Sequence, residues 1–265
     1  VDGNTFSDGA EGVFVYESDA TVQNNTWTNY SRYAAYFSNG ADSSTYQNNV
    51  YENSSGHAIL CDGSTVAISN LEVDRTMSTS FGGYEILIDG VSSGTYSDPI
   101  TAYPASHFTD CTSSIDNTSY ADTVATAVYA TGGTISLDTV SITRASAEAI
   151  FGSAAVNLDG SVNPVSATID NLTVTDQGYG SAISIGGSIT DGGYTASLVA
   201  SDILVNGGRG DAIELSYTDS QIDEVSLSGM EGSGLYITGG TVTVDGGVIS
   251  GAGSDGVYAA VAELA

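Results

Sequence analysis

A short apolar pattern repeats along the whole sequence, and this repeat most constrains the fold. In each unit an apolar residue is followed five positions later by a second one, and successive units begin 21 to 35 residues apart. The first residues of these pairs are Val1, Val22, Tyr46, Ile68, Tyr103, Ile135, Ile169, Leu198, Ile222 and Val244. Their partners are Phe6, Trp27, Tyr51, Val73, Phe108, Val140, Val174, Ile203, Leu227 and Ile249. A period of this length indicates stacked supersecondary units.

A second apolar pair with a spacing of two residues follows later in each unit. These pairs begin at Val13, Ala35, Ile59, Ile86, Val128, Ile150, Ile183, Ile213, Leu235 and Val257. Period-2 pairs predict short strands, and the abundant Gly, Ser, Thr and Asn disfavour helices. We therefore expect one all-β domain over residues 1–265, a parallel β-helix solenoid of about ten coils with three short strands per coil. Each strand would pair with its equivalent one coil on, about 4.8 Å away.

Asparagines gather at one predicted corner of the repeat. They stand two or three residues after the start of a unit, at Asn4, Asn24, Asn25, Asn48, Asn49, Asn70 and Asn171. Asn tolerates the left-handed backbone of a sharp corner, and stacked amides can hydrogen-bond along the axis. Together with the repeat, this partial ladder resembles the right-handed parallel β-helix of the pectate lyases and their relatives. The later units mostly lack it.

The resemblance implies a place for a site. In the polysaccharide enzymes of this family, substrate lies along the outside of the first sheet, which the second apolar pair would form here. The outward residues of that sheet would be Phe14, Tyr36, Leu60, Leu87, Tyr129, Phe151, Ser184, Glu214, Tyr236 and Tyr258. Aromatic faces stack on sugars and on proteins, so we predict ligand binding by Phe14, Tyr36, Tyr129, Phe151, Tyr236 and Tyr258. The alternative is that the long loops of the chain cover this row.

A catalytic alternative rests on the predicted third turn, which holds all the arginines: Arg32, Arg75, Arg144 and Arg209. A lyase of this family uses an Arg or Lys base beside acidic residues that hold Ca²⁺. The segment GGRGDAIEL, with Arg209, Asp211 and Glu214, is the best local match. A guanidinium is normally always charged and so is a poor base, and Glu214 is the only carboxylate in the outward row. We therefore favour no catalytic residue. The alternative role of these arginines is to compensate the charge of nearby carboxylates.

A hydrolase reading has less support. The segment SGHAI at 55–59 is similar to a Gly-His motif of polygalacturonase-type hydrolases. The Asn-Thr-Asp and Asp-Asp motifs of those enzymes do not stand at the matching places.

The charge excludes other classes of function. The chain carries 32 acidic and four basic residues, for a net charge of −28. Such a surface repels nucleic acid, and no apolar run is long enough to span a membrane. The composition is similar to that of proteins from halophilic or marine microbes. We expect an extracellular or cell-surface segment of a larger protein, with glycosylation candidates at Asn24, Asn29, Asn53, Asn117 and Asn171.

The motifs require no cofactor, and the metal site is left unknown. Loop aspartates such as Asp62, Asp89, Asp98 and Asp219 make Ca²⁺ a candidate ligand. In the repeat, Cys61 and Cys111 stand two coils apart, about 9.6 Å at the usual strand spacing. A disulfide needs Cα atoms within about 7 Å. We therefore expect a buried thiol at Cys61, with the disulfide as the alternative.

Three functions remain after these exclusions. The favoured one is a non-catalytic surface, adhesion or filament module that binds glycan or protein along the aromatic row. The alternative is a polysaccharide lyase or related carbohydrate-active enzyme acting on acidic polysaccharide. The third is end-to-end self-association, because no cap covers the predicted ends of the solenoid.

Overall fold

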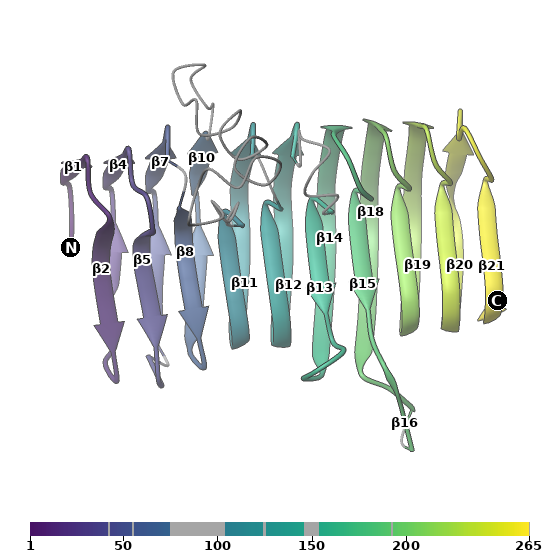
Figure 1. Cartoon of the computed structure of the whole chain (residues 1–265), viewed down its shortest axis with the longest axis horizontal. Coiled ribbons are helices and arrows are strands. Elements are labelled where there is room, and N and C mark those ends of the chain that lie inside the picture. The colour runs from purple at the N-terminus through teal and green to yellow at the C-terminus, as the bar shows by residue number, and fades with distance from the viewer. Residues whose placement is uncertain are drawn as a thin grey trace, which may run out of the picture.

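The structure, a computed structural model, describes residues 1–41, 43–54, 56–74, 104–123, 126–145, 154–191 and 193–264. This part of the chain is all-β. Its strands stack side by side from the N-terminus to the C-terminus in a solenoid-like sheet (Figure 1). A short antiparallel hairpin, β16 (Ile189–Thr190) and β17 (Gly193–Tyr194), projects from it. Within these ranges there is no helix, and hence none that could cross a membrane.

Pairing in the large sheet is parallel and follows three series. We call the first series the first sheet; it contains β2 (Glu11–Tyr16), β5 (Tyr33–Ser38), β8 (His57–Asp62), β13 (Val156–Asp159), β15 (Ile183–Gly186) and the first residues of β11 (Ser106–Ala121), β12 (Val128–Thr143), β19 (Ile213–Met230), β20 (Leu235–Ser250) and β21 (Val257–Leu264). The second series contains β3 (Thr21–Gln23), β6 (Ser44–Gln47), β9 (Thr65–Ser69), the first part of β14 (Val165–Gln177) and of β18 (Ala196–Gly208), and later residues of β11, β12, β19, β20 and β21. The third contains β1 (Thr5–Ser7), β4 (Thr26–Thr28), β7 (Val50–Glu52), β10 (Glu72–Asp74) and the ends of the long strands β11, β12, β14, β18, β19 and β20.

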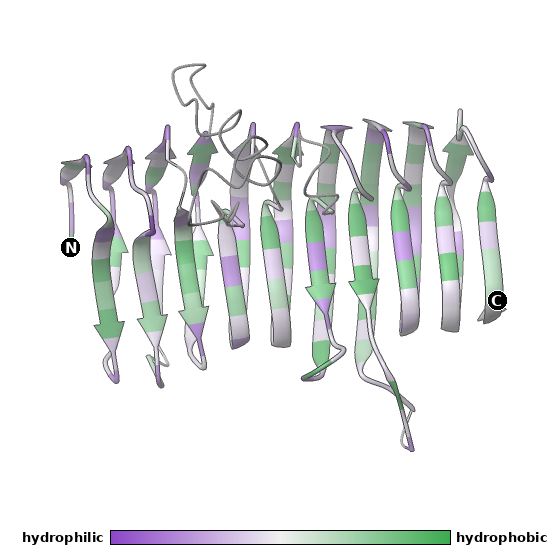
Figure 2. Ribbon diagram, viewed as in Figure 1, coloured by the Kyte–Doolittle hydropathy of each residue, from purple (hydrophilic) through white to green (hydrophobic). Residues whose placement is uncertain are grey.

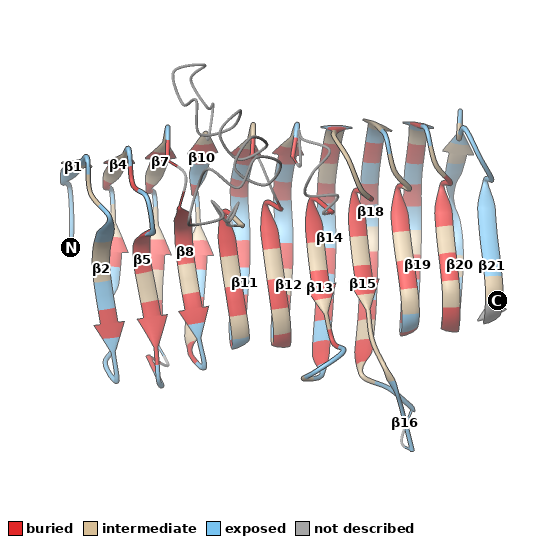
Figure 3. Ribbon diagram, viewed as in Figure 1, coloured by how far each residue is buried: buried red, intermediate tan, exposed pale blue. Residues whose placement is uncertain are grey.

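The apolar repeat builds the core between these series. Buried residues alternate with less buried ones along most strands, and most of the buried residues are apolar (Figures 2 and 3). Large aromatic side chains fill the N-terminal part, where Trp27 is fully buried and stacks on Phe6 with ring centroids 4.3 Å apart. Val, Ile and Leu fill the later part. Trp27, one of the fifth-position apolar residues of the repeat, therefore lies in the core.

The predicted asparagine ladder is present at the corner between the second and third series. Asn24 Nδ2 donates to Asp2 Oδ1 at 2.7 Å, and Asn48 Nδ2 donates to Asn24 Oδ1 at 3.1 Å. Asn70 then donates to Asn48 at 2.8 Å, and Asn117 to Asn70 at 2.6 Å. These four asparagines have φ between 45° and 56°, the left-handed region that Asn tolerates. The sequence pattern missed Asn117 as a ladder member.

An inner ladder runs one residue further along the chain. Asn49 is fully buried, and its Oδ1 accepts from the backbone N of Asn25 at 2.9 Å and from Asn25 Nδ2 at 3.0 Å. Its Nδ2 donates to the carbonyl of Val22 at 2.9 Å. Asn25 Oδ1 in turn accepts from the backbone N of Asn4 at 3.0 Å. These bonds satisfy polar groups that would otherwise be costly to bury.

The assignment of the middle units is wrong in part. Phe108 was expected at the fifth position of a unit beginning at Tyr103, but it lies in the first sheet, paired with Cys61 and Ala130. Ile135 and Leu198 point inward as expected. However, each stands two residues before the position that aligns with Ile68 in the stacked strands of the second series. The reason is that the lengthened units contain extra apolar residues that fit the same spacing. Tyr103, Ile86 and Ile150 lie outside the described residues.

The prediction of a buried thiol at Cys61 is also wrong, because Cys61 and Cys111 form a disulfide. Their Cα atoms are 6.4 Å apart, within the reach of a bridge. Since β8 pairs directly with β11, the two cysteines lie on neighbouring coils and not two coils apart.

Candidate functional site

The outer face of the first sheet carries one side chain from each successive strand, in register. We call these residues the outer row: Phe14, Tyr36, Leu60, His107, Tyr129, Asn157, Ser184, Glu214, Tyr236 and Tyr258. Of the residues predicted to bind ligand, Phe14, Tyr36, Tyr129, Tyr236 and Tyr258 stand in this row. Phe151 lies outside the described residues, as does Leu87, and the positions expected for them are taken by Asn157 and His107.

Each strand that carries the outer row has a small residue next to its start. Directly before the inward pair of each first-sheet strand stands Gly or Ala: Gly12, Ala34, Ala58, Ala105, Ala127, Ala155, Ala182, Ala212, Gly234 and Gly256. The seven alanines have no exposed surface, and a Cβ on Gly12 would lie 2.0 Å from the carbonyl oxygen of Ala34. Except at Gly256, where an added Cβ would meet nothing within 4 Å, these strands therefore begin close against their neighbours. This column was the available sequence signal for finding Ser106 and Val156 as the starts of their strands.

Aromatic rings meet at both ends of the outer row. Near the N-terminus, Phe14 is 55% exposed and its ring centroid lies 5.0 Å from that of Tyr36. Near the C-terminus, Tyr236 and Tyr258 stack face to face at 4.8 Å with an interplanar angle of 8°. Exposed flat rings of this kind can pack against the apolar face of a sugar.

The middle of the row is built around His107, which the sequence pattern missed. Its ring centroid lies 5.0 Å from that of Tyr129 and 5.4 Å from that of His57. Burial lowers the pKa of the His107 imidazole below its usual 6.5, and the Asp62 carboxylate acts in the opposite direction. Burial, and then the Asp159 carboxylate, raise the pKa of Tyr129. Both groups are therefore uncharged near neutral pH and can exchange hydrogen bonds with hydroxyl groups.

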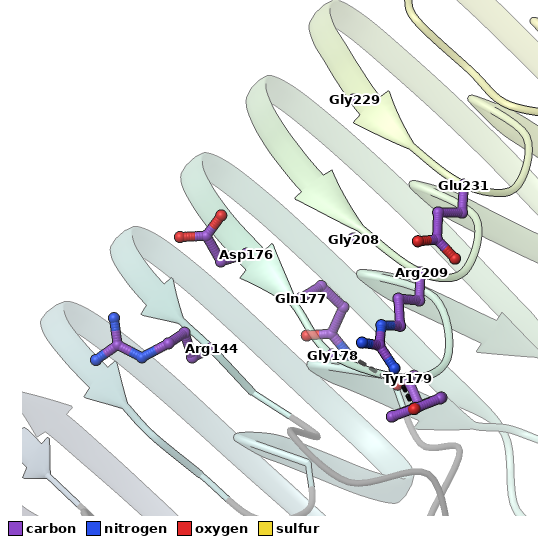
Figure 4. Close-up of a pocket in the computed structure, with 9 residues that line it drawn as sticks. All are labelled: Arg144, Asp176, Gln177, Gly178, Tyr179, Gly208, Arg209, Gly229 and Glu231. Carbon is purple, nitrogen blue, oxygen red and sulfur yellow. Dashed lines mark hydrogen bonds between the residues drawn. The ribbon is translucent and has the colours of Figure 1, made fainter.

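A depression of about 450 Å³ lies at the turn between the third series and the first sheet. Figure 4 shows the residues that line it: Arg144, Asp176, Gln177, Gly178, Tyr179, Gly208, Arg209, Gly229 and Glu231. The guanidinium carbon of Arg209 lies 4.5 Å from the centroid of the Tyr179 ring, and Arg209 Nη1 donates to Tyr179 Oη. Arg144 points away from this pair (Figure 4) and forms an ion pair with Asp122 through Nε and Oδ1 at 2.5 Å.

The predicted trio of Arg209, Asp211 and Glu214 follows this turn, but its members have separate partners. Arg209 contacts Tyr179. Asp211 Oδ1 accepts from the backbone N of Ser233 at 2.5 Å, and Glu214 Oε2 accepts from Ser181 Oγ at 2.8 Å. In the part of the chain that the structure covers, no ion pair joins Arg209 to either carboxylate. The trio is close in sequence without converging on one point.

The arginines that the sequence placed in the third turn also have their own partners. Arg32 forms an ion pair with Glu11, and Arg144 one with Asp122. Arg75 lies outside the described residues. The two ion pairs fit the expected charge compensation and are too exposed to add much stability.

The glycosylation candidates are all exposed and have a left-handed backbone: Asn24, Asn29, Asn53, Asn117 and Asn171. Asn24 and Asn117 belong to the outer asparagine ladder. Asn29 Nδ2 donates to Asp8 Oδ1 at 2.8 Å, and Asn171 Nδ2 donates to Thr139 Oγ1 at 3.4 Å. Glycosylation stays a prediction, and the atom it would modify already links neighbouring coils at these four positions.

No metal centre is defined by the described residues, since no three His, Cys, Asp or Glu side chains there are grouped to hold an ion. Of the candidate Ca²⁺ ligands, Asp62 ends the first-sheet strand β8 and Asp219 lies in the second series. The two are therefore not neighbours. Asp89 and Asp98 lie outside the described residues.

The fold and this face define a parallel β-helix with an outward row of aromatic and polar side chains. A family model described as "Right handed beta helix region" matches residues 1–100, which confirms the resemblance found in the sequence. No curated protein matches the chain.

Among solved structures, the catalytic unit of a thermostable GH87 α-1,3-glucanase from Streptomyces thermodiastaticus strain HF3-3 is similar, with a TM-score of 0.61 and 12% sequence identity. The alignment covers 92% of this chain and 46% of that one, so the chain spans about half its length. The catalytic domain of a GH87 α-1,3-glucanase in complex with nigerose has a TM-score of 0.44 and 10% identity, over 99% of this chain and 62% of that one. At these identities the likeness concerns the fold alone.

Proposed function

We propose that this chain is the β-helix of a carbohydrate-active protein, and that a neutral polysaccharide lies along the outer row of the first sheet. The proposal includes about ten coils of three strands each, stacked from Val1 to Ala265. With strands about 4.8 Å apart, the row from Phe14 to Tyr258 is about 43 Å long. A polymer of sugars fits a surface of this length better than a single small molecule does.

The arrangement of the outer row is the observation that carries the proposal. Aromatic rings are paired at both of its ends, and Tyr236 and Tyr258 are stacked face to face. Between the ends, His107, Asn157, Ser184 and Glu214 present groups that exchange hydrogen bonds with hydroxyls. Aromatic faces flanking polar side chains suit the alternating apolar and hydroxyl surfaces of a sugar chain.

The charge of the protein favours a neutral polymer over an acidic one. At a net charge of −28, a polyuronide or a sulfated glycan would approach against a repulsive field. The likeness to the α-1,3-glucanase fold agrees with a glucan as partner, since glucans carry no charge. Secretion is part of the proposal, and the disulfide between Cys61 and Cys111 supports an oxidising compartment.

Glycoside hydrolysis is the second candidate function, and the position of Glu214 favours it over lyase chemistry. Glu214 is the carboxylate of the outer row, and Ser181 holds one of its oxygens. A hydrolase needs a carboxylic acid beside the scissile bond and a second carboxylate to activate water or attack. Asp159 ends β13, two strands from the strand β19 that carries Glu214, and is the candidate for the second role.

Retention and turnover on a panel of glycans test the proposal. We expect native affinity gels containing soluble α-glucans to slow the protein, and gels containing polygalacturonate not to. Tyr236→Ala combined with Tyr258→Ala should weaken binding by about tenfold or more, which corresponds to about 1.4 kcal/mol. Tyr194→Ala is the matched control, because Tyr194 is exposed on the β17 hairpin away from the outer row.

The outcomes separate the two candidate functions. Retention without release of reducing sugar supports a binding module. Sugar release that Glu214→Gln abolishes supports a hydrolase. Retention by polygalacturonate alone, or by none of the glycans, would overturn the proposal.

A further inference from the structure

The chain contains two histidines, and the fold brings them side by side on the first sheet. His57 begins β8 and His107 lies near the start of β11, two strands that pair directly. Their ring centroids are 5.4 Å apart with an interplanar angle of 50°. In a chain with so few basic groups, this contact gives the centre of the outer row a chemistry found nowhere else in the sequence.

The two imidazoles have different surroundings. His57 is 6% exposed, and its Nδ1 lies 2.8 Å from the carbonyl oxygen of Pro104. A carbonyl oxygen can only accept, so Nδ1 of His57 carries a proton. His107 is half-buried in the outer row against the edge of Tyr129. Among the described residues, no side chain or carbonyl forms a hydrogen bond with either ring nitrogen of His107.

The charged and titratable groups that face His107 come from both neighbouring strands. His57 and the Asp62 carboxylate are contributed by β8, and Tyr129 by β12. Asp159 on β13 acts on Tyr129 and lies one strand further along. Burial outweighs the attraction of Asp62 in its effect on the His107 pKa, so the uncharged ring is the stable form at neutral pH.

We propose that His107, Tyr129 and His57 form the central sugar subsite of the outer row, and that this subsite binds glycan in the uncharged form of His107 and releases it on acidification. This inference rests on the proposed function. A sugar placed over His107 would remove its remaining contact with water. Removing an uncharged imidazole from water costs little free energy, and its unprotonated nitrogen can accept a hydrogen bond from a sugar hydroxyl. Removing an imidazolium from water costs the free energy of its hydration.

Calorimetric titration with soluble α-1,3-gluco-oligosaccharides at pH 7.5 and pH 5.0 tests the inference. We expect weaker binding at the lower pH, by up to about tenfold for each pH unit below the pKa of His107. His107→Gln should weaken binding at pH 7.5 and make the affinity independent of pH over this range. His57→Gln is the comparison, because it leaves His107 able to titrate and should keep the dependence on pH.

The result can separate this inference from the proposed function. Equal affinity of the native protein at the two pH values would overturn the inference and leave glycan binding standing. A pH dependence that survives in His107→Gln would assign it to another titratable group, His57 or a carboxylate, and overturn the inference as well. Binding at neither pH would overturn both. Circular dichroism melts of each variant at both pH values show that the folded protein is measured. The two imidazole signals in a ¹H–¹³C spectrum report directly which histidine loses its proton.

Discussion

The disulfide between Cys61 and Cys111 ties the first-sheet strand β8 to the next coil, where Cys111 follows the first-sheet part of β11. It closes a loop whose ends are 50 residues apart in sequence. A crosslink over a loop of this length restricts the unfolded chain strongly.

Removing this bridge should therefore destabilise the protein. We expect Cys61→Ser combined with Cys111→Ser to lower the free energy of unfolding by about 4 kcal/mol. Urea unfolding followed by circular dichroism measures the change. Native protein unfolded in the presence of a reductant is the control and should match the double variant. An unchanged midpoint in both would contradict the bridge.

The inner asparagine ladder should be more sensitive to substitution than the outer one. Asn49→Ala removes bonds to Asn25 and Val22 inside the core, and we expect a loss of about 3 kcal/mol, from several buried polar groups at once. Asn48→Gly is the matched control, because Asn48 is exposed and Gly accepts its left-handed φ of 52°. Its cost should be about 1 kcal/mol or less. Equal losses in the two variants would argue against a special role for the buried amide.

Two glycines of the small-residue column offer a test of close packing. A Cβ on Gly234 would lie 2.4 Å from Cγ2 of Ile249, whereas a Cβ on Gly256 meets nothing within 4 Å. Neither has a left-handed φ, so the backbone accepts Ala at both positions. We expect Gly234→Ala to cost about 1–3 kcal/mol through overpacking, and Gly256→Ala to change stability by less than about 0.5 kcal/mol. Thermal melting of the two variants measures the difference. A lower melting temperature for Gly256→Ala than for Gly234→Ala would refute this packing.

The stability of the fold should depend on pH through His107. Because burial depresses its pKa in the folded state, the unfolded chain binds the proton more readily below pH 6.5. The contribution of His107 is therefore fully present above that value and is lost as the pH falls through the folded pKa. In His107→Gln, the free energy of unfolding should fall less between pH 7.5 and pH 5.0 than in the native protein. A larger fall in the variant would reverse the sign and exclude this cause.

Lyase activity should be absent. Arg209 stacks on Tyr179, and Glu214 bonds to Ser181, so the base and the acid of the candidate trio do not converge on one substrate position. With polygalacturonate and Ca²⁺ we expect no rise in ultraviolet absorbance from unsaturated products. A rise that disappears in Arg209→Ala would show that the two side chains rearrange when substrate binds.

Much of the fold follows from local rules that can be read in the sequence. The period-2 pairs, the inward position of Trp27 and the corner asparagines each reflect the geometry of a single strand or turn. The exceptions concern the lengthened units. There, Tyr103 and Phe108 satisfy the same spacing as a true unit, and only pairing between strands shows that Phe108 belongs to the first sheet.

The candidate site was predictable to a similar degree. The aromatic ends of the outer row follow from position within the repeat, and Tyr236 and Tyr258 were found in this way. His107 was not, because its place beside His57 depends on how the chain returns after a long insertion. The partners of Arg209 and Glu214 could not be predicted either, since they are set by side-chain contacts between coils.

The direct pairing of β10 and β8 with β11 has a consequence for how such a chain can change. β10 pairs with the end of β11, with Asp74 opposite Ala121, and β8 pairs with its beginning, with Ile59 opposite Ser106. The strands before and after residues 75–103 therefore stay in register. Residues can therefore be added or removed between these strands while every later side chain keeps its direction. Natural variation and laboratory grafting can both act there without changing the spacing of the outer row.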